Sequence, residues 1–335
     1  MKILLDKSKN YYKANLHCHT TCSDGKCSPK EIKKKYTAQG YSAVAFTDHE
    51  HLLEHTDLSD DNFVAITSAE LAIKEFPNQS TLKNRKMKVT HLNIYAKDPY
   101  NTTTPCYSSI YDHYVNDENR HLIRHEGEYE RTYDKESIND IVRACHEAGF
   151  LVAYNHPSWS LETANDYLGY EGFDFVEIHN GGCVRAGHTV DENVFFEMTM
   201  AGKKIFCTAA DDNHNVYPFD SPMTDSFGGW VMINAEKLGY AELMDALEAG
   251  DFYASSGPEI YSLTKDGNTV KVECSPAVRI NLLTLGRKHR REIAPVGETI
   301  TEAVFELCDT DEKFRIRVTD EHGNCAYSQY YDANA

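Results

Sequence analysis

The sequence predicts an α/β domain with a mainly parallel sheet, followed by a small all-β module. Between Tyr12 and Gly257, short apolar segments rich in β-forming residues alternate with helical patterns, as in parallel α/β folds. Histidines and acidic residues gather where these segments end. After residue 257 only strand-like segments and turns follow, so we expect two domains, residues 1–257 and 258–335.

Seven segments of the first domain have the length and composition of buried strands. They span residues 12–16, 43–47, 63–67, 89–95, 151–155, 173–178 and 205–208. Residues 229–233 are expected to form an eighth strand or an edge strand.

Helix signals lie between several of these strands. Ser28-Pro29-Lys30-Glu31 combines an N-cap serine, a first-turn proline and a glutamate three residues after the cap, which predicts a helix that ends at Gly40. Residues 137–148, 190–201 and 240–249 are three further predicted helices, each followed by a glycine that suits a helix end.

Residues 97–135 interrupt the alternation, because they are polar and lack a sustained period. A loop of this length in a compact domain is usually functional or mobile, so we interpret it as an insertion over one end of the domain and a candidate lid. The strand-like segments of the second domain are separated by turns such as Asp266-Gly267-Asn268, and predict a small β-sandwich-like module.

The composition excludes several classes of protein. The formal net charge of −18 repels phosphate backbones, so general nucleic-acid binding is not expected. No segment approaches the roughly 20 apolar residues of a membrane helix, and the apolar run at residues 3–5 is too short for a signal peptide. We therefore expect a cytoplasmic protein without membrane association, whose 10 cysteines are free thiols.

Metal-binding side chains follow nearly every predicted strand. The carboxyl ends of parallel strands in an α/β barrel share one face, so these side chains are expected to converge on one pocket. Many buried imidazoles and carboxylates are stable together when they bind cations. The residues are His17, His19, Asp48, His49, Glu70, His91, His156, Glu177, His179, Asp211, Asp212 and His214.

The spacing of these residues also favours metal binding. In His17-x-His19 and Asp212-x-His214, side chains two positions apart on a strand end point the same way and can reach one ion. The mixture of nitrogen and oxygen donors favours Zn, Mn or Fe over Ca or Mg. Cys18 and Cys22 lie among these residues, but thiolate ligation is the less favoured hypothesis because neighbours in a strand face opposite ways.

Four ordered motifs resemble those of the PHP (polymerase and histidinol phosphatase) superfamily. They are Asn15–Thr20 with Ser23-Asp24-Gly25, Thr47-Asp48-His49, Asn155-His156-Pro157 and Asp212-Asn213-His214. The resemblance spans roughly residues 12–257 and implies a distorted seven-stranded (β/α)7 barrel. Residues 177–181, 210–214 and 252–258, with the β-rich tail, are similar to the carbaryl-hydrolase-like branch, which includes phosphoesterases and a carbamate hydrolase.

The resemblance also implies a centre of two or three divalent ions. Carried over by position, a first ion is held by His17, His19, Glu70 and Asp212. Glu70 bridges to a second ion, which His91 and His156 complete. A third ion is held by Asp24, His49 and His214.

Other polar residues are assigned supporting or alternative roles. His179 is expected to be a general acid or substrate contact, with structural hydrogen bonding as the alternative. Arg185 is expected to bind phosphate through its planar fork, with a solvated loop arginine as the alternative. Asp48 is expected to orient a ligand histidine or a strand end, and Asp211 is expected to support the ligands without binding metal itself. His51 and His55 are interpreted as surface residues, and His113, His121 and His125 as insertion residues that could contact substrate.

These observations predict a metal-dependent phosphoesterase that cleaves a small phosphate ester through a metal-bridging hydroxide. The alternative is hydrolysis of a carbamate, ester or amide bond by the same centre. A third hypothesis is a non-enzymatic metal-bearing scaffold, against which the full set of ligands argues. The sequence does not distinguish the first two, because both use the same nucleophile, and it does not predict an oligomeric state.

Overall fold

The computed structural model describes residues 1–75 and 87–334. Its largest sheet contains 14 strands, and a second sheet contains four. The seven predicted strands of the first domain form consecutive neighbours in the large sheet. They are β2 (Asn10–Cys18), β3 (Ala43–Phe46), β4 (Val64–Lys74), β5 (Val89–Ala96), β6 (Phe150–Tyr154), β7 (Phe175–Asn180) and β8 (Phe206–Ala210).

The strand directions are mixed, which corrects the expectation of a parallel barrel. Strands β2, β3 and β4 are mutually parallel, and so are β6, β7 and β8. Strand β5 runs antiparallel to both of its neighbours, β4 and β6. Its amino-terminal end therefore lies at the edge of the sheet where the carboxyl ends of the other strands meet.

The described strands do not form a closed (β/α)7 barrel. Closure would require β8 to pair along β2, but β9 (Trp230–Ala235) occupies that edge of β2 by antiparallel pairing over Asn10–Ala14. The segment after β8 reaches only the end of β2, through an isolated bridge between Cys18 and Asn213. The prediction of a mixed α/β fold is confirmed, and the prediction of a closed barrel is not.

Four of the described helices lie where the sequence predicts helices, and the two shortest were not predicted. The described helices are α1 (Pro29–Thr37), α2 (Lys135–Glu147), α3 (Ala164–Tyr167), α4 (Gly181–Arg185), α5 (Glu192–Met200) and α6 (Tyr240–Ala249). The predicted capping box of α1 is present, since Ser28 and Glu31 bond each other's backbone N–H groups. Short 3-10 turns are η1 (Thr56–Leu58), η3 (Ser109–Tyr114) and η4 (Arg120–Leu122).

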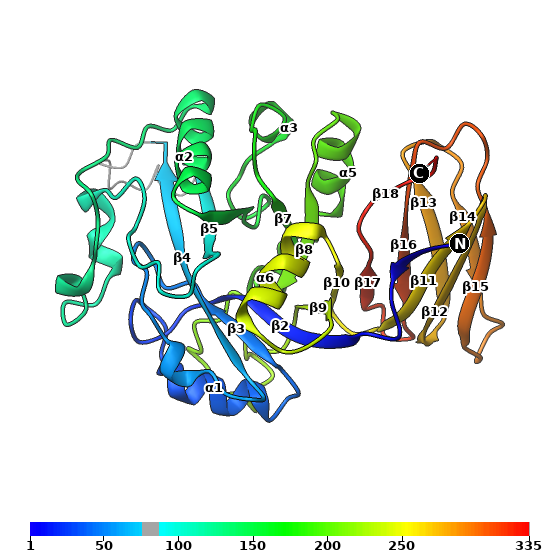
Figure 1. Cartoon of the computed structure of the whole chain (residues 1–335), viewed down its shortest axis with the longest axis horizontal. Coiled ribbons are helices and arrows are strands. Elements are labelled where there is room, and N and C mark those ends of the chain that lie inside the picture. The colour runs from blue at the N-terminus through cyan, green and yellow to red at the C-terminus, as the bar shows by residue number, and fades with distance from the viewer. Residues whose placement is uncertain (76–86, 335) are drawn as a thin grey trace.

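The carboxyl-terminal strands and the first strand of the chain form one β module at one end of the molecule (Figure 1). In the small sheet the order is β1 (Lys2–Leu5), β11 (Ile260–Asp266), β12 (Thr269–Ala277) and β15 (Ile300–Glu306). The large sheet continues from β9 through β10 (Phe252–Ser255) into β17 (Cys325–Tyr327), β16 (Lys313–Thr319), β13 (Arg279–Thr284) and β14 (Arg290–Ile293), while β18 (Tyr331–Asp332) pairs with β16.

Apolar side chains from the two sheets of this module form one buried cluster, which includes Leu5, Ile260 and Phe314. Strand β10 joins the module to the rest of the sheet by pairing with both β9 and β17. The module and the α/β part therefore share a continuous sheet across the expected boundary at residue 257. All 10 cysteines are free thiols, as expected, and no described helix is long and apolar enough to cross a membrane.

Candidate metal centre

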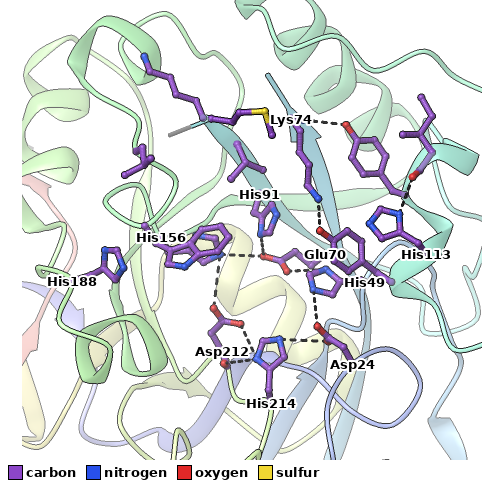
Figure 2. A pocket seen from close by; sticks show the side chains of 18 residues that line it. Asp24, His49, Glu70, Lys74, His91, His113, His156, His188, Asp212 and His214 are labelled. Carbon is purple, nitrogen blue, oxygen red and sulfur yellow. Dashed lines mark hydrogen bonds and ion pairs between the residues drawn. The ribbon is translucent and has the colours of Figure 1, made fainter. Parts of the chain in front are cut away.

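The nine predicted metal ligands converge at one edge of the sheet. All of them except His17 and His19 are labelled in Figure 2. Most of these ligands lie near or just after the carboxyl ends of parallel strands. His91 reaches the same place for a different reason, because it lies near the start of the reversed strand β5. The loop after β2 contributes Asp24, and it turns at Gly25, where an added Cβ would lie 2.6 Å from the His19 carbonyl carbon and oxygen.

Glu70 lies at the middle of the centre, and its side chain is only 1% exposed. Each of its two oxygens faces more than one imidazole. Five imidazole nitrogens lie 3.1–3.4 Å from them: those of His17, His91 and His156 around Oε1, and those of His19 and His49 around Oε2. A carboxylate shared in this way is suited to bridge two cations.

Two further carboxylates extend the centre on either side of Glu70. Asp212 Oδ1 lies 3.2 Å from the Nε2 atoms of both His17 and His19. Asp24 lies 3.4 Å from His214 Nε2, 3.6 Å from His49 Nε2 and 3.7 Å from His19 Nδ1. The donors therefore fall into overlapping groups around Glu70, Asp212 and Asp24, each with space between ligand atoms for a cation.

The electrostatics of the centre depend on positive charge among the acids. Burial opposes ionisation of Glu70, but the charges of His91 and His17 hold the pKa of its carboxyl well below the ordinary value. Burial likewise opposes ionisation of Asp212, whose pKa is lowered by His17 and His19. Burial together with the neighbouring His19 lowers the pKa of His49 well below its ordinary value. Protons on some imidazoles thus offset the acids here, and cations would take that role when bound.

Hydrogen bonds from neighbouring residues orient the ligands. Glu177 Oε1 lies 3.0 Å from His17 Nδ1, so an Nδ1–H donor leaves His17 Nε2 free to bind a cation. Asn155 donates to Glu70 at 2.8 Å, and Asn180 donates to Asp212 at 3.0 Å. Glu177 stood among the strand-end acids in the sequence, but its contact with His17 appears only in the folded chain.

Asp48 and Asp211 hold loops of the centre. Asp48 accepts hydrogen bonds from the backbone and hydroxyl groups of Thr20 and Ser23, in the loop that carries Asp24. Asp211 accepts from the Tyr36 hydroxyl at 2.7 Å and from the peptide N–H groups of residues 227–229. Burial raises the pKa of Asp211 to about 6. In the described structure, both acids thus contact loop residues and not the ligand histidines, and their supporting roles stay predictions.

His179 and Arg185 do not line the cavity beside the centre. The pairing of β7 with β8 shifts register between Glu177 and His179, which breaks the alternation that would place both side chains on one face. His179 Nε2 instead lies 3.1 Å from the Gly228 carbonyl oxygen, and Arg185 donates to the Thr224 carbonyl. These contacts favour a structural role in holding the 224–228 loop, and the catalytic roles of the two residues stay predictions.

A cavity of about 770 Å³ opens beside the ligands. Part of its wall is the 3-10 turn η3 of the predicted insertion, which supplies Tyr111, His113 and Tyr114. Lys74 also lines the cavity, with its Nζ bonded to the Tyr114 hydroxyl. Trp159 packs its ring 4.9 Å from that of His156. Sequence reasoning missed Lys74 and Trp159, since neither stands in a recognisable motif.

The remaining histidines of the sequence analysis are distributed differently. His51 is completely buried, so its interpretation as a surface residue is wrong, whereas His55 is partly buried. The expectation that His113 could contact substrate is compatible with its place in the cavity wall. His121 and His125 do not line this cavity, and His125 stacks on Tyr107.

Comparison with known proteins finds similarity to PHP-domain proteins in the part of the chain that carries several of the candidate ligands. Residues 15–149 match the family model of the PHP domain. The chain is 40% identical over 63 residues to a 5'-3' exoribonuclease of Haemophilus influenzae, a match that covers 19% of each protein. The chain thus spans about a fifth of the length of the curated relative it matches.

Solved structures give weaker similarities. A two-domain protein of Bacteroides vulgatus containing a predicted PHP-like metal-dependent phosphoesterase is 13% identical, with a TM-score of 0.46 over 98% of this chain and 96% of that chain. A candidate metal-dependent phosphoesterase of Bifidobacterium adolescentis is 15% identical, with a TM-score of 0.37 over 63% of this chain and 91% of that chain.

Proposed function

We propose that this protein is a metal-dependent phosphoesterase that hydrolyses a small phosphate ester. The observation that carries the proposal is the convergence of eight histidine and acidic side chains with Glu70, beside a cavity of about 770 Å³. The match of residues 15–149 to the PHP domain supports the same class. A cavity of this volume suits a small-molecule ligand.

The residues fit two or three divalent ions. His19 Nδ1 and His49 Nδ1 are buried without a hydrogen-bond partner among the described residues, although each lies within reach of a carboxylate of the centre. Unpaired imidazole nitrogens beside buried acids are costly unless a cation joins them. The nitrogen-rich donor set favours Zn, Mn or Fe.

Cations bound at this centre would supply water activation and would neutralise charge on the phosphate oxygens. The chain's own residues prepare the site for that chemistry. Glu177 sets the tautomer of His17, and Asp48 holds the loop that presents Asp24. Trp159 lies against the rings of His91 and His156 and helps to hold both imidazoles in position.

Lys74 favours a phosphate ester over the alternative, a neutral carbamate, ester or amide. It lines the cavity and forms no ion pair with any carboxylate among the described residues. By contrast, Lys88 in the same wall is neutralised by Asp166 at 2.7 Å. An unneutralised ammonium group near the metal ligands attracts an anionic substrate. We therefore assign the anion-binding role to Lys74, in place of Arg185.

We further propose that the chain belongs to the carbaryl-hydrolase-like branch of PHP proteins, on the basis of residues 210–214 and the β-rich tail. Because that branch includes both phosphoesterases and a carbamate hydrolase, membership does not identify the substrate. The curated relative is by its name an exoribonuclease, but the net charge of −18 opposes binding of a long polyanion. A small phosphorylated substrate is the better match.

The test is turnover by the purified protein after loading with Mn²⁺, Zn²⁺ or Fe²⁺. The substrate panel contains p-nitrophenyl phosphate, small phosphate mono- and diesters, a 5'-phosphorylated oligonucleotide, and aryl carbamates and esters. We expect turnover of a small phosphate ester that His19→Gln abolishes. The control, His322→Gln, changes an exposed histidine of the β module and should leave the rate unchanged. Absence of turnover of every phosphate ester by protein with metal bound, or preference for the carbamates, contradicts the proposal.

A further inference from the structure

A second cluster of metal-binding side chains lies apart from the nine ligands of the centre. Cys22, Asp48 and His55 each offer one donor atom, and the three atoms lie within 4.8 Å of one another. They come from three parts of the chain: the loop after β2, the segment after β3 and the residue before η1. Their convergence is a product of the tertiary fold.

Asp48 has one oxygen available for a cation. Its Oδ1 accepts three hydrogen bonds, from the Thr20 N–H, the Ser23 N–H and the Ser23 hydroxyl. Its Oδ2 accepts only one described bond, from the Thr20 hydroxyl at 2.7 Å. Asp48 is 2% exposed and forms no ion pair within the described part of the chain. A buried carboxylate with a spare lone pair favours a positive neighbour.

His55 supplies an unpartnered nitrogen. Its Nε2 is buried and has no hydrogen-bond partner in the described structure. The ring is held edge-on against Phe46, with centroids 4.9 Å apart, so it is positioned without a polar contact at Nε2. His55 precedes η1 but makes no capping hydrogen bond. Packing therefore holds this imidazole in place, while its nitrogen is left for another partner.

Cys22 is the cysteine that can complete the group. It is a free, partly buried thiol, and its backbone N–H is anchored by the Thr20 hydroxyl at 3.1 Å. Cys18, the other thiol of the first motif, packs in an apolar cluster with Ile32 and Phe46. The distinction between these two thiols is visible only in the folded chain.

We propose that Cys22, Asp48 and His55 form an additional divalent-cation site, suited to Zn²⁺, outside the catalytic centre. A thiolate, an imidazole and a carboxylate are the three ligand types that Zn²⁺ uses in proteins. The presence of sulfur selects a borderline-soft ion over Mg²⁺ or Ca²⁺. Three protein ligands leave a fourth position for water, which favours an exchangeable ion over a closed structural site.

An ion at this site links the Thr20–Asp24 loop to the segment before η1. That loop carries Asp24, which contacts His49 and His214 in the catalytic centre. Asn116 and Asn119 of the insertion also donate to carbonyl oxygens of this loop. Occupancy of the new site would therefore restrain a loop shared by the centre and the insertion. The proposal does not depend on which bond the enzyme cleaves.

Cobalt substitution tests the site directly. Metal-free protein is titrated with Co²⁺, and the near-ultraviolet absorption of a thiolate–cobalt bond is recorded. None of the nine ligands of the catalytic centre contains sulfur, so this absorption reports the new site whether or not the protein is a phosphoesterase. We expect the natural protein to show the absorption and Cys22→Ser to lack it. Cys22→Ser should also bind one fewer zinc ion per chain than the natural protein. His55→Gln keeps the thiol and should weaken Co²⁺ binding at least tenfold.

The matched control is Cys27→Ser, which changes a similarly exposed thiol five residues away. It should retain both the absorption and the zinc content. Circular dichroism of each variant separates loss of the site from loss of the fold. The proposal is wrong if the natural protein shows no thiolate absorption with saturating Co²⁺. It is also wrong if folded Cys22→Ser keeps that absorption, or if Cys27→Ser loses it equally.

Discussion

Glu70, on β4, and Glu162, in the loop after β6, are two buried glutamates that contact opposite faces of β5 and β6. His91 and Asn155 contact Glu70, whereas the residues directly before them, Thr90 and Tyr154, contact Glu162. Consecutive residues of a strand point to opposite faces, so β5 and β6 present imidazole and amide to one side and hydroxyls to the other. The same backbone thus builds two different environments for one type of side chain.

The surroundings of the two carboxyls shift their pKa values in opposite directions. Glu162 accepts hydrogen bonds from Thr90, Tyr133, Tyr154 and Tyr170. Burial raises the pKa of Glu162 despite these bonds, whereas imidazole charges hold the pKa of Glu70 well below its ordinary value. Hydroxyls satisfy lone pairs without supplying charge, while imidazoles bring protons or metal ions. From this comparison we expect Glu70 to serve cation binding and Glu162 to serve stability.

The largest expected effect is that of Glu70→Gln. An amide bridges cations poorly, so we expect kcat to fall by about a thousandfold with at least one metal equivalent lost. Steady-state kinetics and metal analysis of the folded variant measure both quantities. Retention of full metal content and rate would remove the distinction between the two glutamates.

The next effect is that of Glu177→Gln, which changes the group that orients His17 without removing a ligand. Loss of the charged acceptor at His17 Nδ1 should weaken metal binding by about 10- to 100-fold. Metal titration by calorimetry against the natural protein checks this, and excess metal should restore most of the rate. A variant whose rate stays low in excess metal would show that Glu177 acts in another way.

Glu162→Gln should affect the stability of the fold and spare the metal. The amide offers a donor where a hydroxyl donor already points, so one buried group loses its partner, at a cost of about 2 kcal/mol. Urea unfolding measures the loss, and metal analysis should give the natural content. If this variant loses metal as Glu70→Gln does, the two faces of the strands are not functionally separate.

The smallest expected effect is that of a substitution at Asp191. Burial is the main cause of the pKa shift of this carboxyl, which is surrounded neither by imidazoles, as Glu70 is, nor by hydroxyls, as Glu162 is. Its carboxylate accepts a hydrogen bond from the Ser158 N–H at 3.1 Å, and burial raises its pKa from 3.8 to about 6. The folded state then holds its proton longer than the unfolded state, so this residue lowers the free energy of unfolding as pH rises from 3.8 to about 6.

We therefore expect Asp191→Asn to be more stable than the natural protein by about 1 kcal/mol at pH 7, with no difference at pH 3.5. Unfolding of both proteins across this pH range, at equal metal content, measures the difference. A constant difference at every pH would show that the effect does not come from ionisation of Asp191.

Local pattern was sufficient to predict the strands, the first helix and the residues that gather at the candidate metal centre. Short apolar segments rich in β-forming residues predict strands, Ser28-Pro29 with Glu31 predicts a helix start, and histidines and acids at strand ends predict a metal-binding edge. These features depend on residues close together in the sequence, so they can be recognised before the chain is folded.

The tertiary structure alone decided how those elements meet. Strand β5 is reversed, and β9 takes the edge of β2 that a closed barrel requires; neither choice is encoded in strand composition, because pairing depends on distant partners. The register shift at His179, the Lys74 side chain in the cavity, and the meeting of Cys22 with His55 follow from that pairing. The sequence alone thus determined which side chains could bind metal, and long-range packing determined which of them share a site.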